Sequence, residues 1–282
     1  MAELLKGAAV AASITENLAA RAEALKDKGV TPTLAILRVG ENDGDLSYER
    51  GATNRCGKVG IEVKKIVLPE DAKKEEILSA IQELNDDDTV HGVLMFRPLA
   101  DKSAEIEAGK LLKPEKDVDA MTPTSLASVF IGNGDGYAPC TAQACVEILK
   151  HYGVTLKGAN VVVIGRSAVI GKPVSMLLQK ENATVTMCHT KTVNLPDVAK
   201  SADVLIVAAG RAGIVNADYV REGQVVIDVG INVDEEGKLC GDVDFASVEP
   251  IVSAITPVPG GVGSVTTSVL ASHIIEAAEQ AI

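Results

Sequence analysis

The 282-residue sequence lacks any run of about 18 consecutive apolar residues, the length that a helix needs to cross a bilayer. Its first 29 residues also lack the uninterrupted apolar segment of a signal peptide, because Lys6, Thr15, Glu16 and Asn17 break the run. This segment instead predicts an amphipathic surface helix. We therefore expect a cytoplasmic protein that does not enter a membrane.

Clustered metal ligands and an excess of basic residues are also absent. The four histidines stand apart, and the cysteines form no CxxC pair but are scattered at Cys56, Cys140, Cys145, Cys188 and Cys240. Zinc sites and disulfide frameworks need tighter clusters, so we expect no metal and predict buried free thiols. The net charge of −12 disfavours a nucleic-acid partner but permits a local basic pocket for an anionic ligand.

Helical and strand patterns alternate along the chain, which predicts an α/β fold with mainly parallel sheets. Strands are expected at 31–39, 61–68 and 90–98, with helices over 45–60 and 73–88. A second series of strands, rich in β-branched residues, is expected at 160–165, 183–189, 203–210 and 223–230, and a closing helix at 266–280. Two α/β units are thus predicted, with the change between them around 120–157. A cleft between two such units commonly holds a ligand.

The segment 160–179, NVVVIGRSAVIGKPVSMLLQ, predicts a dinucleotide site. Gly165 would permit a sharp exit from a buried strand, and Gly171 would let the start of a helix approach a phosphate. Ser167 stands where the usual GxGxxG pattern has its second glycine. A glycine-rich turn of purely structural purpose is the alternative, and the four strands around the motif favour a nucleotide.

The end of the following strand favours NADP over NAD. NAD sites usually place an acidic residue there for the ribose 2′-hydroxyl, whereas this chain has His189, Thr190 and Lys191. Arg166 also lies in the first turn, and a guanidinium can pair with a 2′-phosphate through two hydrogen bonds. The alternative is a solvated lysine next to a capping threonine.

An ordered set of motifs extends over the chain: PEKDVDA, PCT, GRSAVIGKP, ATVTMCHTKT, VIDVGIN, GDVDF and ITPVPGGVG. With these motifs the chain resembles the methylenetetrahydrofolate dehydrogenase/methenyltetrahydrofolate cyclohydrolase family, often called FolD, over nearly its whole length. The resemblance implies a homodimer that oxidises a one-carbon unit carried on tetrahydrofolate. It also implies a folate-binding domain over 1–120, completed by the helix 266–282, and a Rossmann-type NADP-binding domain over 140–265. Folate and nicotinamide would meet in a cleft between the two.

The resemblance implies particular site residues as well. Contacts to NADP would come from Gly165, Arg166, Ser167, Thr190 and Ile231. The expected catalytic residues are Tyr48, lying against the folate ring system, and Asp119, accepting hydrogen bonds from pterin N–H groups. The loop 257–263 would line the substrate pocket through Pro257, Pro259, Gly260 and Gly261. Taken singly, a packing tyrosine, a turn aspartate and a rigid turn would explain the same residues.

Two positions depart from the family pattern. Family enzymes carry a lysine four residues after the tyrosine on one helical face, where this chain has Ala52. A glutamine that partners the lysine is replaced by Phe96. That lysine assists the cyclohydrolase step, and Arg55, two turns from Tyr48, stays protonated and is a poor base. We therefore expect a dehydrogenase with weak or absent cyclohydrolase activity.

Three alternatives stay open at this point. The first is an ordinary bifunctional dehydrogenase/cyclohydrolase that produces 10-formyltetrahydrofolate. The second is a non-catalytic protein that binds nucleotide or folate, against which the intact GRSAVIGKP segment counts. The third is an amino-acid-type dehydrogenase, against which Asp119 and the PVPGGVG segment count.

Overall fold

The computed structural model describes residues 1–282, and their contacts divide the chain into two compact units. The C-terminal unit contains Met1–Ala12 and Thr141–Thr266, and the N-terminal unit contains Ser13–Cys140 and Thr267–Ile282. Two of the three boundaries fall inside the helices α1 (Gly7–Asp27) and α10 (Gly263–Gln280), and the third lies between Cys140 and Thr141. None of the helices is both long and apolar enough to cross a membrane.

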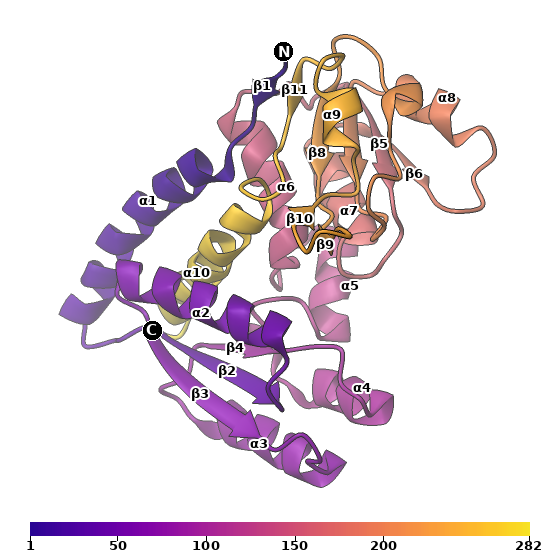
Figure 1. The fold of residues 1–282 in the computed structure, drawn as a ribbon. Helices are drawn as coiled ribbons and strands as arrows, with labels where there is room; N and C mark the ends of the chain where they lie inside the picture. Colours follow the sequence, from indigo (N-terminus) through magenta and orange to yellow (C-terminus); the bar gives the residue numbers. More distant parts are fainter. The chain divides into compact units, whose positions relative to one another are not determined.

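The C-terminal unit is built on a six-stranded parallel sheet in the order β1-β11-β8-β7-β5-β6 (Figure 1). Its strands are β1 (Glu3–Leu4), β5 (Asn160–Ile164), β6 (Thr184–Cys188), β7 (Val204–Val207), β8 (Val225–Asp228) and β11 (Ala254–Ile255). The other elements of the unit are α6 (Cys140–His151), α7 (Gly171–Lys180), α8 (Leu195–Lys200), α9 (Phe245–Val248), the 3₁₀ turn η2 (Ala217–Tyr219) and the hairpin of β9 (Asn232–Val233) with β10 (Leu239–Cys240).

The strand order reverses direction between β5 and β7. From β5 the chain adds β6 on one side and then crosses over to add β7 on the other side. This is the topological switch point at which doubly wound sheets bind ligands, beyond the carboxyl ends of the strands. The sequences VVVI in β5 and VLIV in β7 are almost completely buried, as strands covered on both faces must be. The predicted α/β class with parallel sheets is confirmed.

The N-terminal unit has a smaller parallel sheet in the order β3-β2-β4. Its strands are β2 (Thr33–Val39), β3 (Glu62–Leu68) and β4 (Gly92–Met95), and its helices include α2 (Asp43–Val59), α3 (Lys74–Asp86), α4 (Lys102–Leu111), the 3₁₀ turn η1 (Pro114–Lys116) and α5 (Pro123–Ile131). Helix α2 begins where the Asn42 side chain accepts the N–H of Gly44 at 2.8 Å, and it ends at Gly60 in the left-handed conformation. Residues of α3 and α4 pack with the sheet in one apolar core.

The beginning of the chain differs from the expectation. The sequence predicts a surface helix within residues 1–29 and an N-terminal domain that begins at residue 1, but Glu3 and Leu4 form β1, which pairs with β11. The backbone N–H of Gly7 then donates to Gly260 at 2.9 Å. These hydrogen bonds place Met1–Ala12 in the C-terminal unit. A two-residue strand with an exposed side-chain pattern carries no periodic signal, so the sequence could not reveal it.

Two buried carboxylates organise the loops at the carboxyl ends of β7 and β8. Asp242 accepts the backbone N–H groups of Ala209, Gly210 and Arg211 at 2.6, 2.8 and 2.9 Å. Asp228, at the end of β8, accepts N–H groups from Gly230, Asp242 and Val243, each at 3.0 Å. Because a buried carboxylate needs such donors, the two aspartates fix the path of three separate loops.

We predict that Gly241→Ala destabilises the C-terminal unit. A Cβ atom at residue 241 would lie 1.8 Å from Oδ2 of Asp228, so the buried carboxylate would have to move. Overpacking of this kind typically costs about 1–3 kcal/mol, which urea unfolding followed by circular dichroism would measure. The matched control is Gly57→Ala in α2, where no atom lies within 4 Å of the added Cβ. The control should be neutral or gain up to about 1 kcal/mol, and equal losses in both variants would contradict the assignment.

Candidate functional site

The turn between β5 and α7 brings backbone segments together more closely than any side chain would allow. Gly165 has φ +138°, and a Cβ on it would lie 2.2 Å from the carbonyl oxygen of Ala208 at the end of β7. A Cβ on Gly171 would lie 2.2 Å from the carbonyl oxygen of Gly165. Both positions therefore require glycine, and the backbone of this turn lies open at the switch point of the sheet.

The side chain of Ser167 stabilises the same turn by accepting backbone hydrogen bonds within it. Its Oγ accepts the N–H of Ile170 at 3.0 Å and that of Gly171 at 3.4 Å, at the start of α7. The serine therefore satisfies helix N-terminal groups at the position where the usual fingerprint has a glycine. Arg166 and Ser167 are exposed, so their polar groups can reach a bound molecule.

The turn after β6 presents polar groups without a carboxylate. The N–H of His189 donates to Oγ1 of Thr192 at 2.9 Å, and the N–H of Lys191 donates to Nδ1 of His189 at 3.1 Å. These bonds close the turn and leave Thr190 and Lys191 exposed at its tip. Sequence reasoning missed the role of Thr192, four residues beyond the end of β6, although threonine hydroxyls commonly hydrogen-bond to the backbone of turns.

Ile231 and the 257–261 loop line one hollow of the C-terminal unit. Its volume is about 220 Å³, and its lining consists of Asp228–Ile231, Leu239 and Pro257–Ser264. Ile231 is 67% exposed, so its side chain is free to contact a ligand in this hollow. The structure therefore brings Ile231, expected to contact NADP, together with Pro257, Pro259, Gly260 and Gly261, expected to line the substrate pocket.

In the N-terminal unit, the ring of Tyr48 meets the edge of the Phe96 ring. The ring centroids are 5.8 Å apart and the planes are inclined by 85°. Burial raises the pKa of Tyr48 well above its ordinary value, and the neighbouring Cys140 and Asp119 raise this pKa further. The phenol therefore stays neutral. Ala52, one turn farther along α2, is completely buried.

Asp119 is a half-buried carboxylate, and the chain fills only part of its hydrogen-bond acceptor positions. Its Oδ1 accepts the backbone N–H of Cys140 at 2.8 Å, and Cys140 is its only hydrogen-bonding partner in the chain. Burial raises the pKa of Asp119, while the bond from Cys140 and the charge of Arg97 oppose that rise. A carboxylate has about four acceptor positions, so Asp119 retains capacity for donors from a ligand.

The segment around Asp119 is held by residues that sequence reasoning did not single out. The carboxylate of Asp117, fully buried, accepts the N–H groups of Met121 and Thr122 at 2.9 and 2.8 Å. His273 on α10 places Nδ1 2.9 Å from the carbonyl oxygen of Val118. The spacing of Asp117 and Asp119 was a possible sequence signal for a structural and a ligand-binding carboxylate in one turn, because side chains two residues apart can face different environments.

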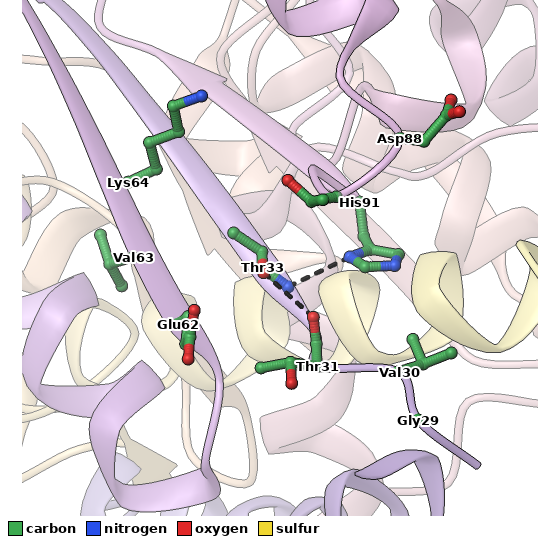
Figure 2. Close-up of a pocket in the computed structure, with 10 residues that line it drawn as sticks. Gly29, Val30, Thr31, Thr33, Glu62, Val63, Lys64, Asp88 and His91 are labelled. Carbon is green, nitrogen blue, oxygen red and sulfur yellow. Dashed lines mark hydrogen bonds between the residues drawn. The ribbon is translucent and has the colours of Figure 1, made fainter.

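A second hollow lies in the N-terminal unit, at the amino ends of β2, β3 and β4 (Figure 2). It has a volume of about 700 Å³, and it is lined by Gly29–Thr31, Thr33, Glu62–Lys64, Asp88, Thr89 and His91. Nδ1 of His91 accepts the N–H of Thr33 at 3.2 Å, a contact drawn in Figure 2. None of the predicted site residues lines this hollow. No group of three His, Cys, Asp or Glu residues anywhere in the structure could hold a metal ion.

The sequence matches two family models. Residues 5–119 match the tetrahydrofolate dehydrogenase/cyclohydrolase catalytic domain, and residues 139–282 match the NAD(P)-binding domain of the same family. The chain belongs to the tetrahydrofolate dehydrogenase/cyclohydrolase family. The resemblance stated from the motifs is confirmed, and so is the C-terminal NAD(P)-binding domain.

Individual relatives of the same family are similar to this chain over nearly their whole length. A protein from Clostridioides difficile (strain 630), called bifunctional protein FolD, is 54% identical over 275 residues, covering 98% of this chain and 96% of the relative. The crystal structure of the bifunctional enzyme FolD from Campylobacter jejuni has a TM-score of 0.96 at 38% identity, with 100% of both chains covered. A FolD structure from Trypanosoma brucei, complexed with NADP cofactor and inhibitor, has a TM-score of 0.93 at 32% identity and covers 99% of this chain and 98% of its own.

We predict that the buried imidazole of His273 makes this family member sensitive to acid. Burial lowers the pKa of His273 from 6.5 to about 4, so the unfolded chain binds a proton in this range before the folded chain does. Stability contributed at this position is complete above pH 6.5 and is lost as the pH falls toward 4. The shift corresponds to roughly 3 kcal/mol.

The measurement compares urea unfolding of the wild type and of His273→Asn between pH 4 and pH 7. Asparagine does not titrate, so the stability difference between the two proteins should move in favour of the variant as the pH falls. Parallel stability curves for the two proteins would show that His273 does not carry this dependence.

Proposed function

We propose that the chain is an NADP-dependent 5,10-methylenetetrahydrofolate dehydrogenase with weak or absent cyclohydrolase activity. One observation carries the proposal. Helix α2 keeps Tyr48, while Ala52 on the same helix and Phe96 after β4 stand where the family pattern has a lysine and a glutamine. The product would be 5,10-methenyltetrahydrofolate. The names of the relatives support the reaction class.

The turn after β5 fits a dinucleotide. Gly165 and Gly171 let the backbone make a tight turn at the switch point of the sheet, and the exposed segment 166–169 beside the start of α7 suits a pyrophosphate. Exposed Arg166 and Thr190 would contact the 2′-phosphate, and Ile231 would contact the nicotinamide half. When bound, NADP supplies the hydride acceptor.

The folate would be held by the N-terminal unit. Asp119 would accept hydrogen bonds from the N–H groups of the pterin, because its carboxylate has unfilled acceptor positions. Tyr48 would lie against the ring system with its phenol neutral. The loop that includes Pro257, Pro259, Gly260 and Gly261 would line the substrate pocket. Hydride transfer depends chiefly on holding the reacting carbons together, and these residues serve that purpose.

The cyclohydrolase step needs a group that moves protons while water adds to the methenyl carbon. Ala52 offers no such group, and Phe96 packs its ring against Tyr48 where a glutamine amide would offer hydrogen bonds. A second candidate is the ordinary bifunctional enzyme, and the 54% identical relative, called bifunctional protein FolD, favours it. A homodimeric state belongs to the same proposal, on the strength of the resemblance.

The products formed over time test the reaction. With methylenetetrahydrofolate and NADP, we expect reduced nicotinamide to form while the methenyl product accumulates. Immediate conversion to 10-formyltetrahydrofolate would favour the bifunctional enzyme, and binding of NADP without any turnover would favour a non-catalytic protein.

The double variant Ala52→Lys with Phe96→Gln tests the cause of the proposed loss. It should raise the cyclohydrolase rate by roughly 10² or more, the usual contribution of a positioned acid–base group. The matched control is Ala52→Met with Phe96→Gln, which adds similar length at residue 52 but no amine. If both double variants stay at the wild-type rate, these two positions do not account for the difference.

The variant Arg166→Ala tests the preference for NADP. Loss of a charge-assisted hydrogen bond worth about 1.5–3 kcal/mol should lower kcat/KM for NADP by roughly 10- to 100-fold, with little change for NAD. The control is Lys180→Ala, which removes an exposed cation at the far end of α7. A parallel loss with NADP and NAD would assign Arg166 to the shared pyrophosphate instead.

A further inference from the structure

The carbonyl group that precedes Asp119 is held by two side chains from distant parts of the sequence. Nδ1 of His273, on α10, lies 2.9 Å from the oxygen of Val118. Sγ of Cys140, at the start of α6, donates to the same oxygen at 3.4 Å. A peptide carbonyl has two lone pairs, and here two donors from different helices approach it.

The imidazole of His273 can act here only as a donor. A carbonyl oxygen accepts hydrogen bonds and cannot give one, so the proton of the neutral ring must lie on Nδ1. Burial keeps the ring neutral, since it lowers the pKa of His273 to about 4. The ring of Tyr137 packs against it with centroids 4.9 Å apart and an interplanar angle of 35°, which restricts the ring's rotation.

Cys140 connects this carbonyl to the carboxylate of Asp119. Its Sγ contacts the oxygen of Val118, while its backbone N–H donates to Oδ1 of Asp119 at 2.8 Å. Its Sγ also lies 3.7 Å from Nδ1 of His273. His273 and Cys140 thus hold both the backbone before Asp119 and its carboxylate. After Asp119 in the chain, the carboxylate of Asp117 accepts the N–H groups of Met121 and Thr122.

We propose that His273 is a positioning residue that, together with Cys140, sets the direction of the Asp119 carboxylate toward a ligand that presents adjacent N–H donors. The inference rests on the proposed function, in which that ligand is the pterin. A carboxylate that receives two donors from a planar heterocycle must be held in one orientation, because small errors of direction weaken both bonds. His273 itself does not touch the substrate.

Two substitutions at residue 273 separate positioning from packing. His273→Leu fills the site but removes the donor to Val118. His273→Asn keeps an N–H donor at about the distance of Nδ1 from the main chain. The control is Ser268→Ala on the same helix, because Ser268 is fully buried and its Oγ makes no hydrogen bond.

The readouts are kcat, the separate KM values for methylenetetrahydrofolate and NADP, and calorimetric binding of unreacted tetrahydrofolate. His273→Leu should raise the folate KM and the tetrahydrofolate Kd by about tenfold, the effect of roughly one neutral hydrogen bond, and leave the KM for NADP unchanged. His273→Asn should recover most of the folate affinity, and Ser268→Ala should match the wild type. Equal folate affinities in the leucine and asparagine variants, or a parallel rise in the KM for NADP, would overturn the inference.

Two further variants cover the case in which His273→Leu does not fold. Cys140→Ser keeps a donor to Val118 and Cys140→Ala removes it, while both keep the backbone N–H that binds Asp119. The alanine variant should weaken folate binding and the serine variant should not, and equal effects would again overturn the inference. Failure of the wild type to bind or oxidise the folate would instead reject the proposed function, so the two failures are distinguishable.

Discussion

The carboxyl edge of the larger sheet depends on two buried carboxylates that gather backbone N–H groups. Asp242 is completely buried, and besides three backbone N–H groups it accepts the side-chain amide of Asn232 at 2.9 Å. Asp228 is almost as buried, and burial raises its pKa to about 6. Such groups are tolerable only when their acceptors are filled, so the loops after β7 and β8 and the β9–β10 hairpin must converge on them. The position of Ile231 follows from this convergence.

In the N-terminal unit, Asp117 and Asp119 differ in how many of their acceptor positions the chain fills, and this difference indicates which of them can bind a ligand. Asp117 is completely buried and has both oxygens filled by backbone N–H groups, which makes it part of the scaffold. Asp119, two residues later, is half-buried and receives hydrogen bonds from Cys140 alone. Two positions of one turn, separated by Val118, therefore carry a satisfied and an incompletely satisfied acceptor. The unsatisfied one is the group that a ligand can complete.

The parts of this structure that could be predicted from sequence are those with local or periodic causes. The buried strands VVVI and VLIV, helix α2 and the glycines of the β5–α7 turn follow from periodicity and backbone geometry. The pairing of β1 with β11 and the contact of His273 with Val118 join residues more than 150 positions apart, and neither has a local signal. Asp119 could be named only through the family resemblance, because the Cys140 N–H that distinguishes it from Asp117 comes from another segment.

The two activities associated with this family place different demands on the same pocket. Hydride transfer needs two carbon atoms held close together in a fixed orientation, a task that rigid surfaces can perform. Addition of water needs a group that takes up and returns protons. A buried lysine is costly unless it is partnered, and a buried glutamine left without its partner is costly as well. With Ala52 at the lysine position and Phe96 at the glutamine position, neither side chain needs a hydrogen-bonding partner, and the Phe96 ring packs against Tyr48 with centroids 5.8 Å apart. The surfaces that hold the substrate need not change.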